Sequence, residues 1–172
     1  ITNLPIRAEI FDAIYCMGVI QHTPEPETVI RTLPRYLKPG GKLAYNFYEE
    51  GIWRRLQIIK YLLRLVTPFL SVQITMSVSK ALVRYLFPVT RFLSQLPKFR
   101  ILNHFIPIAA VHDRQLSEAD QFIWTLLDTF DWYGARYEKC QNHSMVARHL
   151  REEGMLEIDS RPGLTRAKKG EI

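Results

Sequence analysis

The stretch from Phe11 to Phe47 constrains the fold more than any other part of the sequence. It contains an apolar run over 11–18, a polar turn, an amphipathic segment and a second apolar run over 42–47. Two apolar runs separated by one helix are typical of parallel strands joined by a crossover. In open parallel sheets, ligands bind beyond the carboxyl ends of the strands. The polar turn at 18–25 follows the first predicted strand, so we expect a functional site there.

The segment between the two predicted strands carries the signals of a helix. Pro24 or Pro26 suits its first turn, where a backbone N–H has no helical partner. Apolar residues then recur every three to four positions as far as Leu37. Pro34 predicts a kink, because it removes one helical hydrogen bond. The sequence Lys38-Pro39-Gly40-Gly41 predicts a stop before the second strand.

Basic residues are concentrated in one segment. The net charge is +6, yet residues 51–112 contain nine Lys or Arg and no Asp or Glu, and the rest of the chain has 14 basic and 17 acidic residues. The segment is strongly apolar, and its longest run without charge, 65–79, is shorter than the roughly 20 residues of a membrane span. We therefore predict a small basic helical insertion, divided into short helices by Pro68, Pro88, Pro97 and Pro107.

Sequence patterns in the last third of the chain predict two further helices and one strand. Ser117 begins a Ser-Glu-Ala-Asp capping box before an amphipathic run. Ser144 is expected to cap a second helix that ends at Gly154. The aromatic cluster 130–133 is expected to be a loop, 155–158 a short strand, and the tail with Arg166, Lys168 and Lys169 a solvated end. The predicted domains are a core at 1–50, a cap insertion at 51–116, and remaining core helices with a terminal strand at 117–172.

Composition places the chain among folded globular proteins. Hydrophobic residues make up 47% of the sequence and aromatic residues 12%. Two cysteines, Cys16 and Cys140, form no disulfide framework, so we expect a reducing, cytoplasmic environment. Cys140, His143 and His149 do not have the spacing of a zinc site, and no metal is predicted.

Residues 4–47 resemble the second half of the class I S-adenosylmethionine-dependent methyltransferases, and in particular the broad type 11 group. The similarity is carried by Leu4-Pro5, Phe11-Asp12-Ala13-Ile14, Gly18-Val19-Ile20-Gln21-His22 and Leu37-Lys38-Pro39-Gly40-Gly41-Lys42-Leu43. The stretch Asp128–Tyr133, followed by a Ser-capped helix, is also similar to the family. The resemblance implies an α/β fold, in which a Rossmann-like methyltransferase sheet carries a helical cap insertion. It also implies S-adenosylmethionine as the cofactor.

The resemblance also suggests site residues. Cys16, Met17, Gly18 and His22 would contact the cofactor, and His22 is a candidate general base because histidine titrates near neutral pH. The alternatives are strand-end packing for the first three and a turn hydrogen bond for His22. Asp131, Tyr133 and Tyr137 are candidate substrate-binding residues, with packing in the core as their alternative.

The chain lacks two parts of the family pattern. These are the glycine-rich cofactor loop and the acidic residue that holds the ribose, and both belong upstream of Ile1 in the family. We therefore expect the chain to be the C-terminal part of a methyltransferase, with no tight cofactor binding of its own. An alternative is that a second polypeptide supplies the loop.

Two classes of function remain open. The first is methyl transfer to a small-molecule or lipid-like acceptor, with peripheral contact between residues 51–112 and a membrane surface. The second is a non-catalytic interaction module whose basic helices dock on an acidic partner or a membrane surface. Nucleic acid is a weaker candidate partner, because aromatic residues in this segment recur at the spacing of a helix core.

Overall fold

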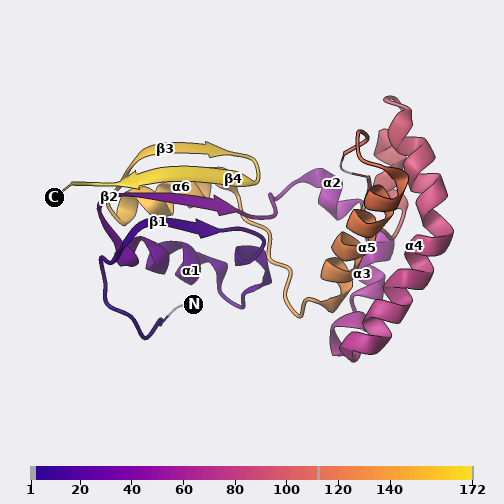
Figure 1. The fold of residues 1–172 in the computed structure, drawn as a ribbon, viewed down its shortest axis with the longest axis horizontal. Helices are drawn as coiled ribbons and strands as arrows, with labels where there is room; N and C mark the ends of the chain where they lie inside the picture. Colours follow the sequence, from indigo (N-terminus) through magenta and orange to yellow (C-terminus); the bar gives the residue numbers. More distant parts are fainter. Residues whose placement is uncertain (1–2, 112, 172) are drawn as a thin grey trace. The chain divides into compact units, whose positions relative to one another are not determined.

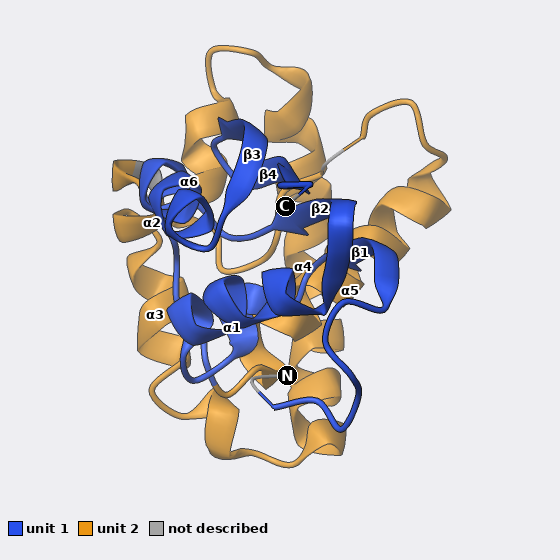
Figure 2. Cartoon of the chain, turned by 90° about the vertical axis from the view of Figure 1, so that its left-hand side faces the viewer, with its two compact units in different colours: residues 1–50, 137–172 blue, residues 51–136 orange. Residues whose placement is uncertain are grey.

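The chain is divided into two units, each with its own core (Figure 2). The structure, a computed structural model, describes residues 3–111 and 113–171. Unit 1 combines the chain before Gly51 with the chain from Tyr137 onward, and unit 2 is Gly51–Arg136. The first boundary coincides with the one predicted after residue 50. The helix after Ser117, which the sequence assigned to the core, is grouped with unit 2 instead.

A four-stranded mixed sheet forms the centre of unit 1 (Figure 1). Its order is β1-β2-β4-β3, with β1 at Phe11–Cys16, β2 at Leu37–Asn46, β3 at Met155–Arg161 and β4 at Leu164–Lys169. β1 and β2 pair in parallel, whereas β4 is antiparallel to both of its neighbours. The predicted α/β class and the predicted parallel pair are confirmed.

The C-terminal residues form an inner strand, so the prediction of a solvated end is wrong. In β4, Thr165 and Ala167 are buried while Arg166 between them is exposed. This is the alternation of a half-buried strand. Because its inward side chains are small, the strand has little apolar signal in the sequence. β3 likewise extends beyond the predicted 155–158.

The Lys38-Pro39-Gly40-Gly41 sequence lies inside β2 as an irregularity, rather than ahead of it as predicted. The register with β1 shifts between Leu37 and Lys42. Gly40 has a φ of +74°, which favours glycine, and a Cβ on Gly41 would lie 2.9 Å from a backbone oxygen. The two glycines therefore allow the strand to pass through this distortion and continue alongside β1.

The connecting helix α1, Pro26–Thr32, tightens into a 3-10 turn at 33–36, so the interruption predicted at Pro34 is confirmed. Proline has no N–H to donate to the Ile30 carbonyl four residues earlier. The buried Tyr45 hydroxyl of β2 donates to that oxygen at 3.0 Å. Burial raises the pKa of Tyr45 well above its usual range, so the hydroxyl keeps its proton. A strand side chain thus supplies the hydrogen bond that the helix lacks.

α1 and α6, His143–Glu152, lie on the same face of the sheet (Figure 1). The Asn142 side chain caps α6 by accepting from the backbone N–H groups of Ser144 and Met145, so the prediction of a Ser144 cap is wrong. Gly154, with a φ of +77°, ends the helix as predicted. The core between helices and sheet includes Ile20, Ile30, Leu43, Tyr45, Val146 and Leu150.

Unit 2 contains helices and 3-10 turns (Figure 1). Pro88, predicted to separate two short helices, lies inside the single helix α4, Val72–Gln95, because the packed faces on both sides of it hold the helix together despite the lost hydrogen bond. The aromatic cluster 130–133, predicted as a loop, forms the last turns of the helix capped by Ser117. The helices are α2 at Ile52–Arg55, α3 at Ile58–Leu63, α4 at Val72–Gln95 and α5 at Glu118–Gly134.

The Tyr45 hydroxyl generates a stability prediction. Tyr45→Phe leaves the Ile30 carbonyl buried without its donor, so the free energy of unfolding should fall by about 1–3 kcal/mol. In a Pro34→Ala background, the new N–H can reach the same oxygen, and Tyr45→Phe should then cost less. Urea denaturation of the four proteins in this double-mutant cycle measures the difference. An equal loss in both backgrounds would contradict the assigned role of Tyr45.

Candidate functional site

The chain leaves the carboxyl end of β1 through an exposed turn. Met17, Gly18 and Val19 are all exposed, and Gly18 has a φ of +72° with no atom within 4 Å of the position of an added Cβ. Its backbone N–H donates to the side-chain oxygen of Asn46, at the end of β2. This bond joins the ends of the two parallel strands and fixes the backbone where a ligand of such a sheet is expected.

His22 lies in the 3-10 turn Ile20–His22, and its ring is held by a carbonyl group. Its Nδ1 lies 3.0 Å from the carbonyl oxygen of Tyr137. A carbonyl oxygen only accepts, so Nδ1 carries the proton, and in the neutral ring Nε2 carries the lone pair. The ring also packs edge-on against Tyr48, with 5.6 Å between centroids. A neutral histidine held in this tautomer can accept a proton at Nε2.

Lys139 braces the same turn. Its backbone N–H donates to the Gln21 carbonyl at 2.8 Å, and its ammonium group donates to the Pro24 carbonyl at 2.7 Å. The Gln21 side chain is buried, and its Oε1 accepts no hydrogen bond from the described residues. Sequence reasoning missed Lys139 because nothing in its local pattern links it to a turn more than a hundred residues earlier.

The four predicted cofactor-binding residues lie close together in the sequence, at the end of β1 and in the turn after it. Their side chains have different surroundings. The Cys16 side chain packs in the core of unit 1, and burial raises the pKa of its thiol. It can therefore meet a ligand only through its backbone. Met17 and Gly18 are exposed, and His22 is half-buried on the turn. Their contact with a cofactor stays a prediction.

The predicted substrate-binding residues do not share one unit. Asp131 and Tyr133 belong to α5 in unit 2, whereas Tyr137 belongs to unit 1. Tyr133 is fully buried, and its hydroxyl donates to the Pro107 carbonyl at 2.7 Å. That contact matches the packing alternative for Tyr133. A substrate-binding role for the three residues stays a prediction.

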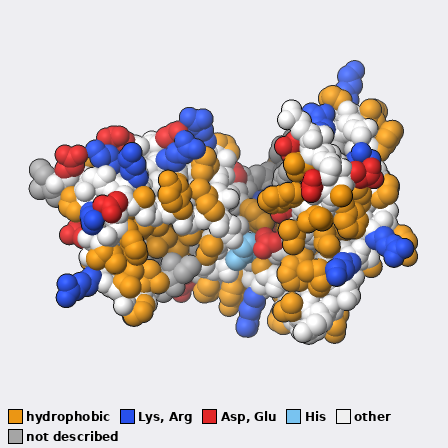
Figure 3. Space-filling model, viewed as in Figure 1, with side chains coloured by type: hydrophobic (Ala, Val, Ile, Leu, Met, Phe, Trp, Pro, Cys, Tyr) orange, Lys and Arg blue, Asp and Glu red, His pale blue; other side chains and the backbone are white. Residues whose placement is uncertain are grey.

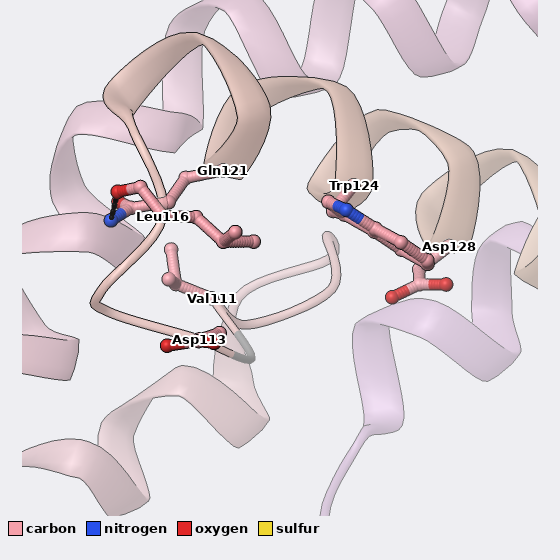
Figure 4. Close-up of a pocket in the computed structure, with 6 residues that line it drawn as sticks. All are labelled: Val111, Asp113, Leu116, Gln121, Trp124 and Asp128. Atoms are coloured by element: carbon pink, nitrogen blue, oxygen red, sulfur yellow. Dashed lines mark hydrogen bonds between the residues drawn. The ribbon is translucent and has the colours of Figure 1, made fainter.

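Unit 2 contains an open pocket that sequence reasoning did not identify (Figure 4). Its volume is about 510 Å³, and the Gln121 amide in its wall donates to the Leu116 carbonyl at 2.9 Å. Gln121, Trp124 and Asp128 recur at three- to four-residue spacing on α5, a pattern that shows they share one helix face. The lining residues are Val111, Asp113, Leu116, Gln121, Trp124 and Asp128.

The carboxylate of Glu49, just after β2, binds two other segments of unit 1. Glu49 accepts from the backbone N–H groups of His143 and Gly163, and its Oε1 lies 2.8 Å from Nδ1 of His143. The carboxylate thus stabilises the positive N-terminus of α6 and holds the β3–β4 turn. Within 3–111 and 113–171, no group of three His, Cys, Asp or Glu side chains could hold a metal ion.

Comparison with known proteins identifies relatives of short parts of the chain. Residues 1–45 match the family model described as "Methyltransferase domain". A segment of 33 residues is 54% identical to a ubiquinone biosynthesis O-methyltransferase of Xanthomonas oryzae, and 46 residues are 37% identical to a tRNA U34 carboxymethyltransferase of Nautilia profundicola. These matches cover 19% and 27% of this chain and only 14% and 15% of the relatives.

A structural comparison covers more of the chain at lower similarity. A "possible exported protein" from Bordetella parapertussis aligns with 95% of this chain and 40% of its own, at 16% identity and a TM-score of 0.40. Similarity at this level is too low to assign the fold.

The conformation of Gly18 can be tested by substitution. In Gly18→Ala the methyl group has room, but alanine does not favour the positive φ of this position. The free energy of unfolding of unit 1 should therefore fall by about 1–2 kcal/mol. Gly18→Asn should cost less, because asparagine adopts the left-handed region more readily. Chemical denaturation followed by far-ultraviolet circular dichroism measures both. Equal costs for the two variants would show that the turn is not held in this conformation.

Proposed function

From the match of residues 1–45 to the methyltransferase domain family model, we propose that the protein containing this chain transfers a methyl group from S-adenosylmethionine. The sheet of unit 1 would then be part of a Rossmann-like methyltransferase sheet. The observation that carries the proposal is the parallel β1–β2 pair, whose carboxyl ends are joined through Gly18 and Asn46. This is the kind of sheet edge at which such folds bind ligands.

The turn after β1 fits one side of the cofactor. When bound, S-adenosylmethionine supplies a methyl group activated by a sulfonium. Gly18 has no side chain, so a ligand can approach its backbone closely, and the exposed Met17 lies beside it. Cys16 would contribute backbone groups only. The chain has no glycine-rich loop of its own, and we propose that this part of the cofactor site lies outside it.

We propose that His22 is the general base. An acceptor that arrives protonated has to lose a proton as it reacts, and the Tyr137 carbonyl keeps the lone pair of the neutral His22 ring on Nε2. The burial of Gln21 and the two hydrogen bonds from Lys139 hold the turn that carries this ring. The other contribution of the chain to the reaction is to bind the reactants and hold them in position.

We further propose a lipid-like or apolar small-molecule acceptor. The support is the pocket on α5, whose volume suits a drug-sized ligand and whose walls include Trp124, Leu116 and Val111. Asp113 and Asp128 at this pocket offer acceptors to a hydroxyl or amine of such a molecule. Asp131 in unit 2 and Tyr137 in unit 1 each remain a proposed contributor to acceptor binding, whereas the fully buried Tyr133 has the contacts of a core residue.

Cofactor binding is tested on the natural gene product that contains this chain. Isothermal titration calorimetry with S-adenosylhomocysteine should show saturable heat at one site per chain. Adenosine triphosphate, which shares the nucleoside but not the amino-acid portion, is the control ligand and should give a much weaker response. The absence of any heat with S-adenosylhomocysteine would reject the methyltransferase proposal and leave the interaction module.

Two substitutions separate the roles of His22. His22→Asn keeps a donor for the Tyr137 carbonyl and removes the base, so it should lower kcat by about 10²-fold or more with little change in cofactor affinity. His22→Ala removes both functions and should also destabilise the turn. The measurements are methyl-transfer rates as a function of pH and cofactor titration. If His22→Asn retains the wild-type rate and pH profile, His22 is a turn residue.

A further inference from the structure

The long helix α4 buries polar side chains and exposes apolar ones. Its packed face contains the buried Thr75, Ser79, Thr90 and Ser94, along with Val83 and Phe87. The hydroxyls of Ser79 and Thr90 are buried with no hydrogen-bond partner among the described residues. This arrangement reverses that of an ordinary surface helix, whose hydrophobic stripe faces the core.

The opposite face of α4 forms an exposed apolar stripe. Ile74, Tyr85, Val89 and Phe92 are exposed, and Tyr85 reaches 77%. Their spacing of three, four, seven or eleven residues keeps them on one side of the helix. On the face shown in Figure 3, hydrophobic side chains cover much of unit 2, and Lys and Arg project at its margins. Such a stripe is energetically unfavourable in water and suits an apolar medium or partner.

The turn between α3 and α4 extends this stripe into an apolar tip. Its side chains Leu65, Val66 and Phe69 are exposed, Phe69 to 79%, and so is Val72 at the start of α4. They lie in the longest stretch without charge in the basic segment, 65–79. No helix in the described parts of the chain is long and apolar enough to cross a membrane. The tip and stripe are therefore suited to lie on a bilayer rather than to pass through it.

The basic residues of this segment divide into inward and outward groups. Lys60 is buried with its ammonium 4.2 Å from the Trp132 ring centroid, Arg64 donates to backbone carbonyls of α5 and the residue after it, and Arg91 pairs with Glu118. Lys80 and Arg84 are exposed, one turn apart on α4, and form no ion pair with the described residues. These two charges lie on the same helix as the apolar stripe and have no ion-pair partner among the described residues.

The positive charge of this face of unit 2 indicates what kind of partner it can bind. Residues 51–111 contain no Asp or Glu, so two copies meeting through this face would bring positive charges together without compensation. The acidic residues of unit 2 begin at Asp113, and most lie on α5, which packs on the inward face of α4. An anionic bilayer surface offers both negative headgroups for Lys80 and Arg84 and an apolar layer for the tip.

We infer that the α3–α4 turn and the outer stripe of α4 form a docking surface for an anionic membrane. Phe69 and Val72 insert at the level of the headgroups, and Lys80 and Arg84 bind lipid phosphates beside them. The inference goes beyond methyl transfer and does not depend on it. If the proposed lipid-like acceptor is correct, this surface also brings unit 2 to the phase that holds it.

The test is flotation of the full chain with phosphatidylcholine vesicles that contain either a quarter phosphatidylglycerol or none. Binding is expected to the anionic vesicles only, and to weaken strongly from 0.1 to 0.5 M salt. Lys80→Gln with Arg84→Gln should lower the partition coefficient about 25-fold, or about fivefold for each charge. Phe69→Ser with Val72→Ser should lower it about tenfold or more.

Tyr15→Ser in unit 1 is the matched control, because Tyr15 is 76% exposed and lies outside the proposed surface. It should leave vesicle binding unchanged. Circular dichroism should show that all variants fold, since each altered side chain is exposed in the wild-type chain. Because cofactor calorimetry does not involve vesicles, failure of docking and failure of the methyltransferase proposal are distinguishable.

Three outcomes would overturn the inference. One is no binding to anionic vesicles, or binding that the surface variants and the Tyr15 control alter equally. Another is a dimer in size-exclusion chromatography with light scattering that Phe69→Ser with Val72→Ser converts to monomer without affecting vesicle binding, which would assign the stripe to a second copy. The third is binding to single-stranded RNA that depends on Lys80 and Arg84 but not on Phe69, without vesicle binding.

Discussion

The parallel pairing of β1 with β2 is the interaction on which unit 1 depends. β2 lies between β1 and β4, so its backbone is paired on both sides, and its side chains Leu43 and Tyr45 are buried under the helices. The single hydrogen bond from Tyr45 to Ile30 ties this strand to the crossover helix at the point where Pro34 interrupts it. Sheet, crossover and proposed ligand-binding edge thus share one strand.

The candidate site is assembled from segments that are far apart in the sequence. The turn at 18–25 is braced by Tyr137 and Lys139, which follow the whole of unit 2. Beyond β2, Glu49 holds the start of α6 and the β3–β4 turn through three hydrogen-bonding groups. The chain therefore leaves the sheet after residue 50 and returns to it at the same end, so unit 2 is an insertion that does not interrupt the core of unit 1.

Unit 2 differs from unit 1 in the polarity of its buried and exposed side chains. In unit 1 the buried side chains are mainly apolar, whereas the interface between α4 and α5 includes hydroxyl groups and the outer surfaces include aliphatic and aromatic residues. Small hydroxyl side chains let two helices approach closely, as they do where the surroundings are apolar. These exposed apolar residues are the basis of the proposed membrane-docking surface.

The sequence by itself determined the parallel strand pair, the interruption at Pro34, the Ser117 cap and the basic character of 51–112, because each depends on local residue chemistry or on apolar spacing. Tertiary structure alone decided that 164–169 form an inner strand, that α4 continues through Pro88, and that Lys139 and Tyr137 brace the turn of His22. Such features depend on pairing partners and packed faces supplied by distant residues. The polarity of α4 shows the same limit: periodicity reveals that a helix has an apolar side, but only the neighbouring elements decide whether that side is buried.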